Sequence, residues 1–267
     1  MKAKILTGIM ALAVGAGSLL AQAQPAQQPP SQPAGPKVPQ PKSKEELQAV
    51  QALFQAQNDP DASIKAAEDL LSKYADTEFK EVALMVEAGA YAKKRDPVKA
   101  QIYAHRVLDI NPKNFQATLM IGEMEAQGIR DNDLDKEDKL ADSEKYLNQT
   151  IENLKTAAKP NPQLPDDQWE QYRKELIAQA HNDLGLDDLS RKKYDAAITE
   201  FKTSIEGDPQ PAYQVRLASA YQSAGKNDEA IAICDKLLAD PQLHPQIQAV
   251  AKDIKAKATQ AKGGAGK

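Results

Sequence analysis

Residues 178–211 have the sequence AQAHNDLGLDDLSRKKYDAAITEFKTSIEGDPQP, and this stretch decides the fold. Its apolar residues recur at helical spacing, which predicts one helix over 178–191 and a second over 195–206. The Gly-Asp-Pro turn at 207–209 ends the second helix, because proline has no N–H to donate and its ring clashes with the preceding turn. The stretch therefore predicts one antiparallel pair of helices.

The same pattern recurs along most of the chain. Complete pairs occupy 33 or 34 residues, and a fixed period of this length is typical of stacked helical hairpins. A helix over 244–262 is expected to cap the exposed end of the stack. The sequence thus predicts an all-α solenoid over residues 44–262. Its units are 44–77, 81–114, 115–160 with an insertion at 128–139, 178–211 and 211–243.

Two helix starts have recognisable capping sequences. Ser43 precedes Glu46 by three residues, the arrangement of a capping box. Asp167 and Glu170 form a similar start for an extended helix that leads into Ala178. These positions predict where the first helix and the fourth unit begin.

Leucines, small residues, aromatic residues and prolines recur at fixed places in three pairs. They are Leu184, Gly185, Tyr194, Ala197, Phe201, Ser204 and Pro209; Leu217, Ala218, Tyr221, Gly225, Ala230 and Pro241; and Ala88, Tyr91, Ala100, Ala104, Val107 and Pro112. In these places the pairs resemble the tetratricopeptide repeat. Small residues such as Gly185 and Ala197 stand where the two helices of such a repeat approach each other closely. Cys234 stands at an aromatic place of the pattern, and the pair at 44–77 matches weakly. The resemblance implies a superhelix whose concave wall is formed by the first helix of each pair.

The N-terminal segment indicates export. Residues 1–23 have the organisation of a secretory signal peptide: a basic start, an apolar stretch of about 16 residues and an Ala-x-Ala site that ends at Ala23. Cleavage before Gln24 would leave a periplasmic or secreted protein with no membrane segment. A retained anchor is the alternative, although the stretch is shorter than the ~20 residues that span hydrocarbon. Residues 24–43 are rich in Pro and Gln and are expected to form a disordered linker.

Charge and composition restrict the partners. The chain has 34 basic and 38 acidic residues, and without Lys2 and Lys4 the balance becomes 32 to 38, a net charge of −6. An acidic chain repels phosphate backbones, so nucleic acid is not expected as a partner.

The sequence contains no recognisable catalytic motif or cofactor signature, and we expect neither enzymatic activity nor a cofactor. His105, His181 and His244 fall on separate units, and Cys234 is interpreted as a packed core thiol. A weak calcium candidate lies in the insertion, but Lys136 occupies the place where a calcium loop needs glycine. Its four carboxylates are Asp131, Asp133, Asp135 and Asp142.

The resemblance implies a ligand-facing wall on the first helix of each pair, and hence a scaffold that binds a partner protein or peptide. Lys93 and Asn182 resemble residues that hold ligand carboxylates in some family members, but they fall in different units. Two other roles remain open: a positional component of a cell-envelope assembly with an empty groove, and an enzyme with an unrecognised site. The residues expected on the wall are Met85, Lys93, Leu119, Glu123, Gln179, Asn182, Leu186, Val215 and Ser219.

Overall fold

The computed structural model describes residues 39–161 and 163–264. The predicted signal peptide and residues 24–38 of the predicted linker lie outside the described residues. Within the described ranges the chain forms α-helices and one 3-10 turn, and no strand. Within the same ranges, no helix combines the length and the apolar character that crossing a bilayer requires.

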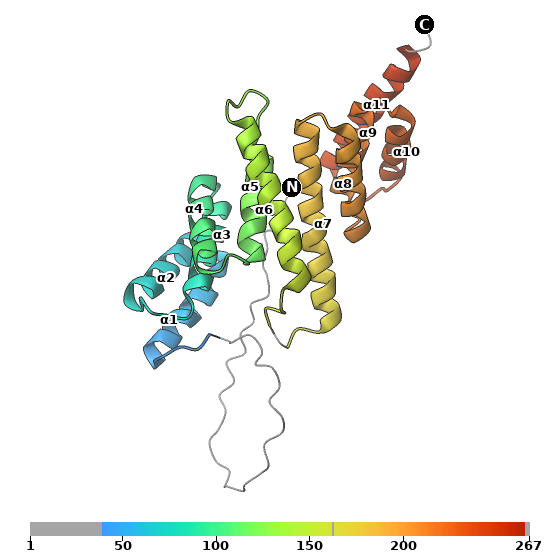
Figure 1. The fold of residues 1–267 in the computed structure, drawn as a ribbon. Helices are drawn as coiled ribbons and strands as arrows, with labels where there is room; N and C mark the ends of the chain where they lie inside the picture. Colours follow the sequence, from blue (N-terminus) through green and yellow to red (C-terminus); the bar gives the residue numbers. More distant parts are fainter. Residues whose placement is uncertain (1–38, 162, 265–267) are drawn as a thin grey trace.

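The helices form successive antiparallel pairs, so the predicted all-α solenoid is confirmed (Figure 1). The array is elongated, with α1 and α2 at one end and α11 at the other. Each helix packs mainly on its neighbours in the chain, and α11 covers α9 and α10 as a cap. The helices are α1 Lys44–Gln55, α2 Pro60–Lys73, α3 Lys80–Lys93, α4 Pro97–Ile110, α5 Phe115–Gly128, α6 Lys136–Thr156, α7 Asp166–Ser190, α8 Tyr194–Gly207, α9 Pro211–Ser223, α10 Asn227–Leu238 and α11 Pro245–Gly264, with a 3-10 turn at Ala56–Asn58.

The capping box at the start of α1 forms with one change. Ser43 Oγ accepts a hydrogen bond from the backbone N–H of Glu46 at 3.0 Å. The Glu46 carboxylate accepts from the N–H of Lys42 at 2.6 Å, one residue earlier than in the usual box. The Lys42 ammonium also binds Asp76 at 2.6 Å, so the residues just before α1 are held against the α2–α3 connection.

Three hairpins turn through the same backbone geometry. Arg95, Lys192 and Gly225 occupy equivalent places in the units 81–114, 178–211 and 211–243, and their φ angles are 59°, 60° and 74°. In each case the next N–H bonds to a carbonyl five residues back, at 3.0, 2.8 and 2.9 Å. This left-handed residue with its reversed bond ends a helix in the manner of a Schellman motif. The 33- to 34-residue period therefore reproduces a backbone turn as well as an apolar pattern.

Small residues allow the paired helices to touch. An alanine methyl at Gly185 would lie 2.6 Å from Cε1 of Phe201, and one at Gly122 would lie 2.7 Å from Cγ of Leu147. Phe201 and Leu147 are both fully buried. The expected close approach at Gly185 is confirmed, and the same device recurs in the α5–α6 pair.

The region from 128 to 190 departs from the expected boundaries. Helix α6 begins at Lys136, inside the predicted 128–139 insertion, so the loop covers only 129–135. Helix α7 is continuous over 25 residues, and no side-chain hydrogen bond caps its N-terminus. The predicted cap at Asp167 and Glu170 was wrong: Pro165 stands at the cap position, and Glu170 pairs with Arg173 at 2.7 Å.

Candidate functional site

The predicted wall residues lie on α3, α5, α7 and α9, the first helices of four successive pairs. Seven of the nine side chains are reachable from solvent: Lys93 is exposed, and six are half-buried. The six are Met85, Glu123, Gln179, Leu186, Val215 and Ser219.

Leu119 and Asn182 are corrections to the predicted wall. Their exposures are 2% and 1%, so neither side chain is available at the surface. Leu119 belongs to a core cluster that includes Leu147 and Trp169. Leu119 is covered by α7, which packs on α5 as well as on α6 and α8, and Asn182 lies on the buried side of α7 itself.

A polar cluster lies where α5, α7 and α9 meet. Glu123 on α5 accepts hydrogen bonds from the side-chain amides of Gln127 at 3.0 Å and Gln179 at 3.1 Å. Burial raises the pKa of Glu123, while the two amides and Arg216 on α9 partly oppose that rise. Two predicted wall residues, Glu123 and Gln179, are therefore in direct contact across helices.

Asp183 on α7 forms the buried part of this cluster. Its Oδ1 accepts from Asn182 at 2.9 Å and lies 3.8 Å from a guanidinium nitrogen of Arg216. Its Oδ2 and the Oδ1 of Asn182 are buried with no hydrogen-bond donor. Burial, and secondarily the charge of Glu123, raises the pKa of Asp183 well above its usual range.

The sequence prediction missed Asp183 and Arg216. Both belong to amphipathic helices rich in charge, where a single carboxylate or guanidinium is ordinary. The available signal was the Asn-Asp pair at 182–183, directly before the apolar Leu184 and the close-packed Gly185. Asn182 and Asp183 thus stand on the buried side of α7 and not on a solvated face.

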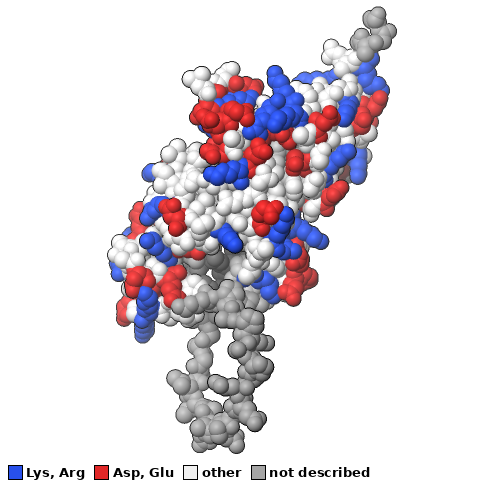
Figure 2. Space-filling model, viewed as in Figure 1, with Lys and Arg blue, Asp and Glu red and all other residues white. Residues whose placement is uncertain are grey.

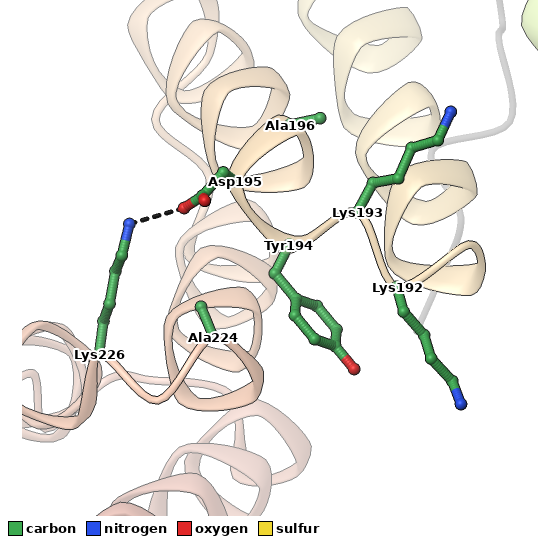
Figure 3. A pocket seen from close by; sticks show the side chains of 7 residues that line it. All are labelled: Lys192, Lys193, Tyr194, Asp195, Ala196, Ala224 and Lys226. Atoms are coloured by element: carbon green, nitrogen blue, oxygen red, sulfur yellow. Dashed lines mark hydrogen bonds and ion pairs between the residues drawn. The ribbon is translucent and has the colours of Figure 1, made fainter.

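The α7–α8 turn borders a cavity of about 390 Å³ lined by lysines (Figure 3). Lys226 is paired with Asp195 at 2.7 Å, and Figure 3 shows the Lys192 and Lys193 side chains pointing in opposite directions. Because the ammonium groups diverge, this cavity does not have the convergent donors that an anion site requires. Figure 2 shows acidic and basic side chains interspersed over the visible face, without a continuous basic stripe.

Three of the four carboxylates of the calcium candidate form ion pairs with lysines. Asp131 pairs with Lys136 at 3.0 Å, while Asp133 and Asp135 both pair with Lys139, at 3.1 and 2.9 Å. Over the described residues, no group of three or more His, Cys, Asp or Glu side chains is arranged to hold a metal ion. The loop 129–135 is therefore organised by ion pairs.

The contacts of His181 and Cys234 are those of structural side chains. His181 Nδ1 on α7 lies 2.7 Å from Glu200 Oε2 on α8. Among the described residues, no third polar side chain is hydrogen-bonded to this pair. Cys234 is fully buried, and burial raises the pKa of its thiol. A buried thiol with a raised pKa is the opposite of an activated nucleophile.

Comparisons with known proteins agree with this architecture. Residues 188–254 match the family model "Tetratricopeptide repeat". No curated protein matches the sequence. A crystal structure of MamA protein is similar at 17% identity and a TM-score of 0.53, over 73% of this chain and 90% of that chain. A second MamA structure, MamA MSR-1 C2, gives 13% identity and a TM-score of 0.51, over 84% and 99%.

A third similar structure is TTC0263, a thermophilic TPR protein of Thermus thermophilus, at 20% identity and a TM-score of 0.46, over 79% of this chain and 97% of that chain. At identities this low, the MamA likenesses show the fold alone. The family model supplies independent sequence evidence over residues 188–254, a range that includes the equivalent turns at Lys192 and Gly225. Residues 188–254 therefore match the tetratricopeptide repeat in sequence, and the described helices have the fold of a tetratricopeptide-repeat array.

Proposed function

We propose that the protein is an exported scaffold that binds an extended or helical segment of a partner protein along the face formed by α3, α5, α7 and α9. The observation that carries the proposal is the mixed character of the accessible side chains on these four helices. Met85, Leu186 and Val215 offer apolar contact, while Gln179 and Ser219 offer hydrogen bonds. Stacked hairpins use such concave faces for binding, and an alternation of apolar and polar contacts suits a peptide ligand.

The same face argues against a ligand held by its terminal carboxylate. Asn182 is buried, and the Lys93 ammonium donates to the carbonyl of Gln57 at 2.7 Å. Asn182 is therefore not accessible to a ligand carboxylate, and Lys93 stands without this partner. Near the centre of the face, the carboxyl groups of Glu123 and Asp183 add no cation that could hold an anionic group.

A charge-and-bulk substitution tests the binding face. Ser219→Arg places a long cationic side chain on α9, and the matched control Thr203→Arg places one on an exposed position of α8. We expect the S219R variant to lose a partner that the wild-type protein and T203R both capture from cell-envelope extracts. Equal capture by all three proteins would remove the proposed face from consideration.

Export is a separate part of the proposal and rests on the sequence of residues 1–23. N-terminal sequencing of the protein recovered from fractionated cells measures it directly. A mature chain that begins at Gln24 in the periplasmic or secreted fraction is expected. A chain that retains its leader in the cytoplasmic fraction would contradict export and leave the binding proposal standing.

Deleting residues 24–38 separates binding from a purely positional role. The deletion spares Gln40 and Lys42, which contact Glu78 and Asp76. A soluble binder keeps its partner after the deletion, whereas a component whose role is to hold a fixed position loses activity in cells while its fold is unchanged.

A further inference from the structure

We propose that the polar cluster of Glu123, Asn182, Asp183 and Arg216 binds a basic side chain, a lysine or an arginine, of the partner segment. This inference rests on the proposed binding face, because the cluster lies on three of its four helices. It adds the chemical class of one ligand group, which the resemblance to other repeat proteins does not supply.

The cluster has more hydrogen-bond acceptors than donors. Asp183 Oδ2 and Asn182 Oδ1 have no donor, although both side chains are 1% exposed. Native proteins rarely leave buried polar atoms without a partner, because each costs free energy comparable to a lost hydrogen bond. The missing groups are N–H donors, which an ammonium or a guanidinium carries and a carboxylate or an apolar side chain does not.

The acidic groups of the cluster also outnumber its basic groups. Two carboxylates, Glu123 and Asp183, face a single guanidinium, that of Arg216. The guanidinium approaches Asp183 only to 3.8 Å, beyond hydrogen-bond distance. A buried carboxylate is stabilised when it is both paired and hydrogen-bonded. A second cation would provide the pairing that Arg216 alone does not.

Access to the cluster runs beside Arg216. Its side chain is 28% exposed, and Glu123 and Gln179 are half-buried, so these groups form the outer layer above Asp183. Among the described residues Arg216 has no hydrogen bond that fixes its guanidinium, so its side chain can change rotamer without breaking one. Tyr213 on α9 is a buried neighbour of Asp183. Burial, and secondarily the charge of Asp183, raises the pKa of the Tyr213 hydroxyl.

Proton binding competes with the proposed ligand. Because burial raises the pKa of Asp183, protonation of this carboxyl group competes with the binding of a cation. Affinity for a basic side chain should therefore increase with pH. The groups that face Asp183 are Glu123 from α5, Asp187 and Asn182 from α7, and Arg216 and Tyr213 from α9.

The test is a titration of the ¹⁵N-labelled full-length chain with three blocked tripeptides, acetyl-Ala-X-Ala-amide, in which X is arginine, lysine or norleucine. The arginine or lysine peptide should shift the amide signals around residues 179–187 and 213–219 and the Nε signal of Arg216, and the norleucine peptide should not. Asp183→Asn and Glu123→Gln should each weaken binding about tenfold. The control Glu206→Gln, on an exposed position of α8, should leave it unchanged.

Three results would overturn the inference. They are the absence of localised shifts with both basic peptides, equal shifts with norleucine, and unchanged affinity in both cluster variants. Circular dichroism of each variant establishes folding, and E123Q keeps the test decisive if D183N does not fold. If S219R abolishes partner capture while the basic peptides do not bind, the binding face survives and only its basic ligand is refuted.

Discussion

Replacing Gly185 with alanine tests the close contact between α7 and α8. The new methyl would lie 2.6, 2.8 and 2.9 Å from three ring atoms of Phe201, which is fully buried. The ring cannot move outward without disturbing its neighbours in the core, which include Leu217 and Ala220. We therefore place the overpacking cost at the upper end of the usual range, about 3 kcal/mol.

The helix itself gains from the same change. Alanine is favoured over glycine in a helix interior by about 1 kcal/mol. The expected net loss for G185A is therefore about 2 kcal/mol of unfolding free energy. Gly89 is the matched control, because it lies inside α3 and a methyl there meets no atom within 4 Å. G89A should gain about 0.5–1 kcal/mol from the same helix preference.

Urea unfolding followed by circular dichroism and by the fluorescence of Trp169, the only tryptophan, measures both variants. The two changes have the same chemistry and should have opposite signs. The reasoning is refuted if G185A is as stable as the wild-type protein, or if G89A loses as much as G185A. Phe201→Leu in the G185A background provides a further check, because a smaller side chain should recover part of the loss.

Three other perturbations follow from single groups. Burial raises the pKa of Glu87 to about 7, although the charge of Arg106 partly opposes the rise. Between the unfolded pKa of 4.5 and the folded pKa, the folded state binds a proton that the unfolded state has released. The free energy of unfolding therefore falls as the pH rises from about 4.5 to above 7. Glu87→Gln should reduce that fall by about 1 kcal/mol, discounted for partial solvation, and thermal melts at pH 5 and pH 8 measure it. Cys234 should not react with Ellman's reagent until the protein is unfolded, and prompt labelling of the native protein would disprove its burial. Gly225→Ala should cost about 1 kcal/mol although space is open around it, because its φ of +74° disfavours a side chain. Lys192→Ala should change stability by less than about 0.5 kcal/mol, because Lys192 already carries a side chain at this φ. Equal effects of the two substitutions in urea melts would contradict this account of the turn.

The sequence predicted the helix pairs because their signals are local. Ser43 and Glu46 are three residues apart, and Gly207 to Pro209 form a contiguous stop. The period of the pairs also places Gly185 against Phe201, since both positions belong to one hairpin. Such features need no knowledge of which units are neighbours.

The errors arose where one unit meets another. Leu119 and Asn182 occupy positions that face outward in a regular repeat, but here α7 packs on α5 and both side chains are buried. The polar cluster depends on the same contact, because Glu123, Asp183 and Arg216 come from three helices separated by loops. A single sequence gives the order of the helices, but the burial of a charged side chain depends on how they pack.

The near-absence of contacts between distant units has a mechanical consequence. Among the described residues, helices pack mainly on the next helix in the chain. The main contacts that skip a helix are those of α5 with α7 and of α9 with α11. A force applied between α1 and α11 would therefore act on one hairpin interface after another. We expect such an array to extend in hairpin-sized steps under tension and to recoil when released, so that the distance between two attached partners would vary with load.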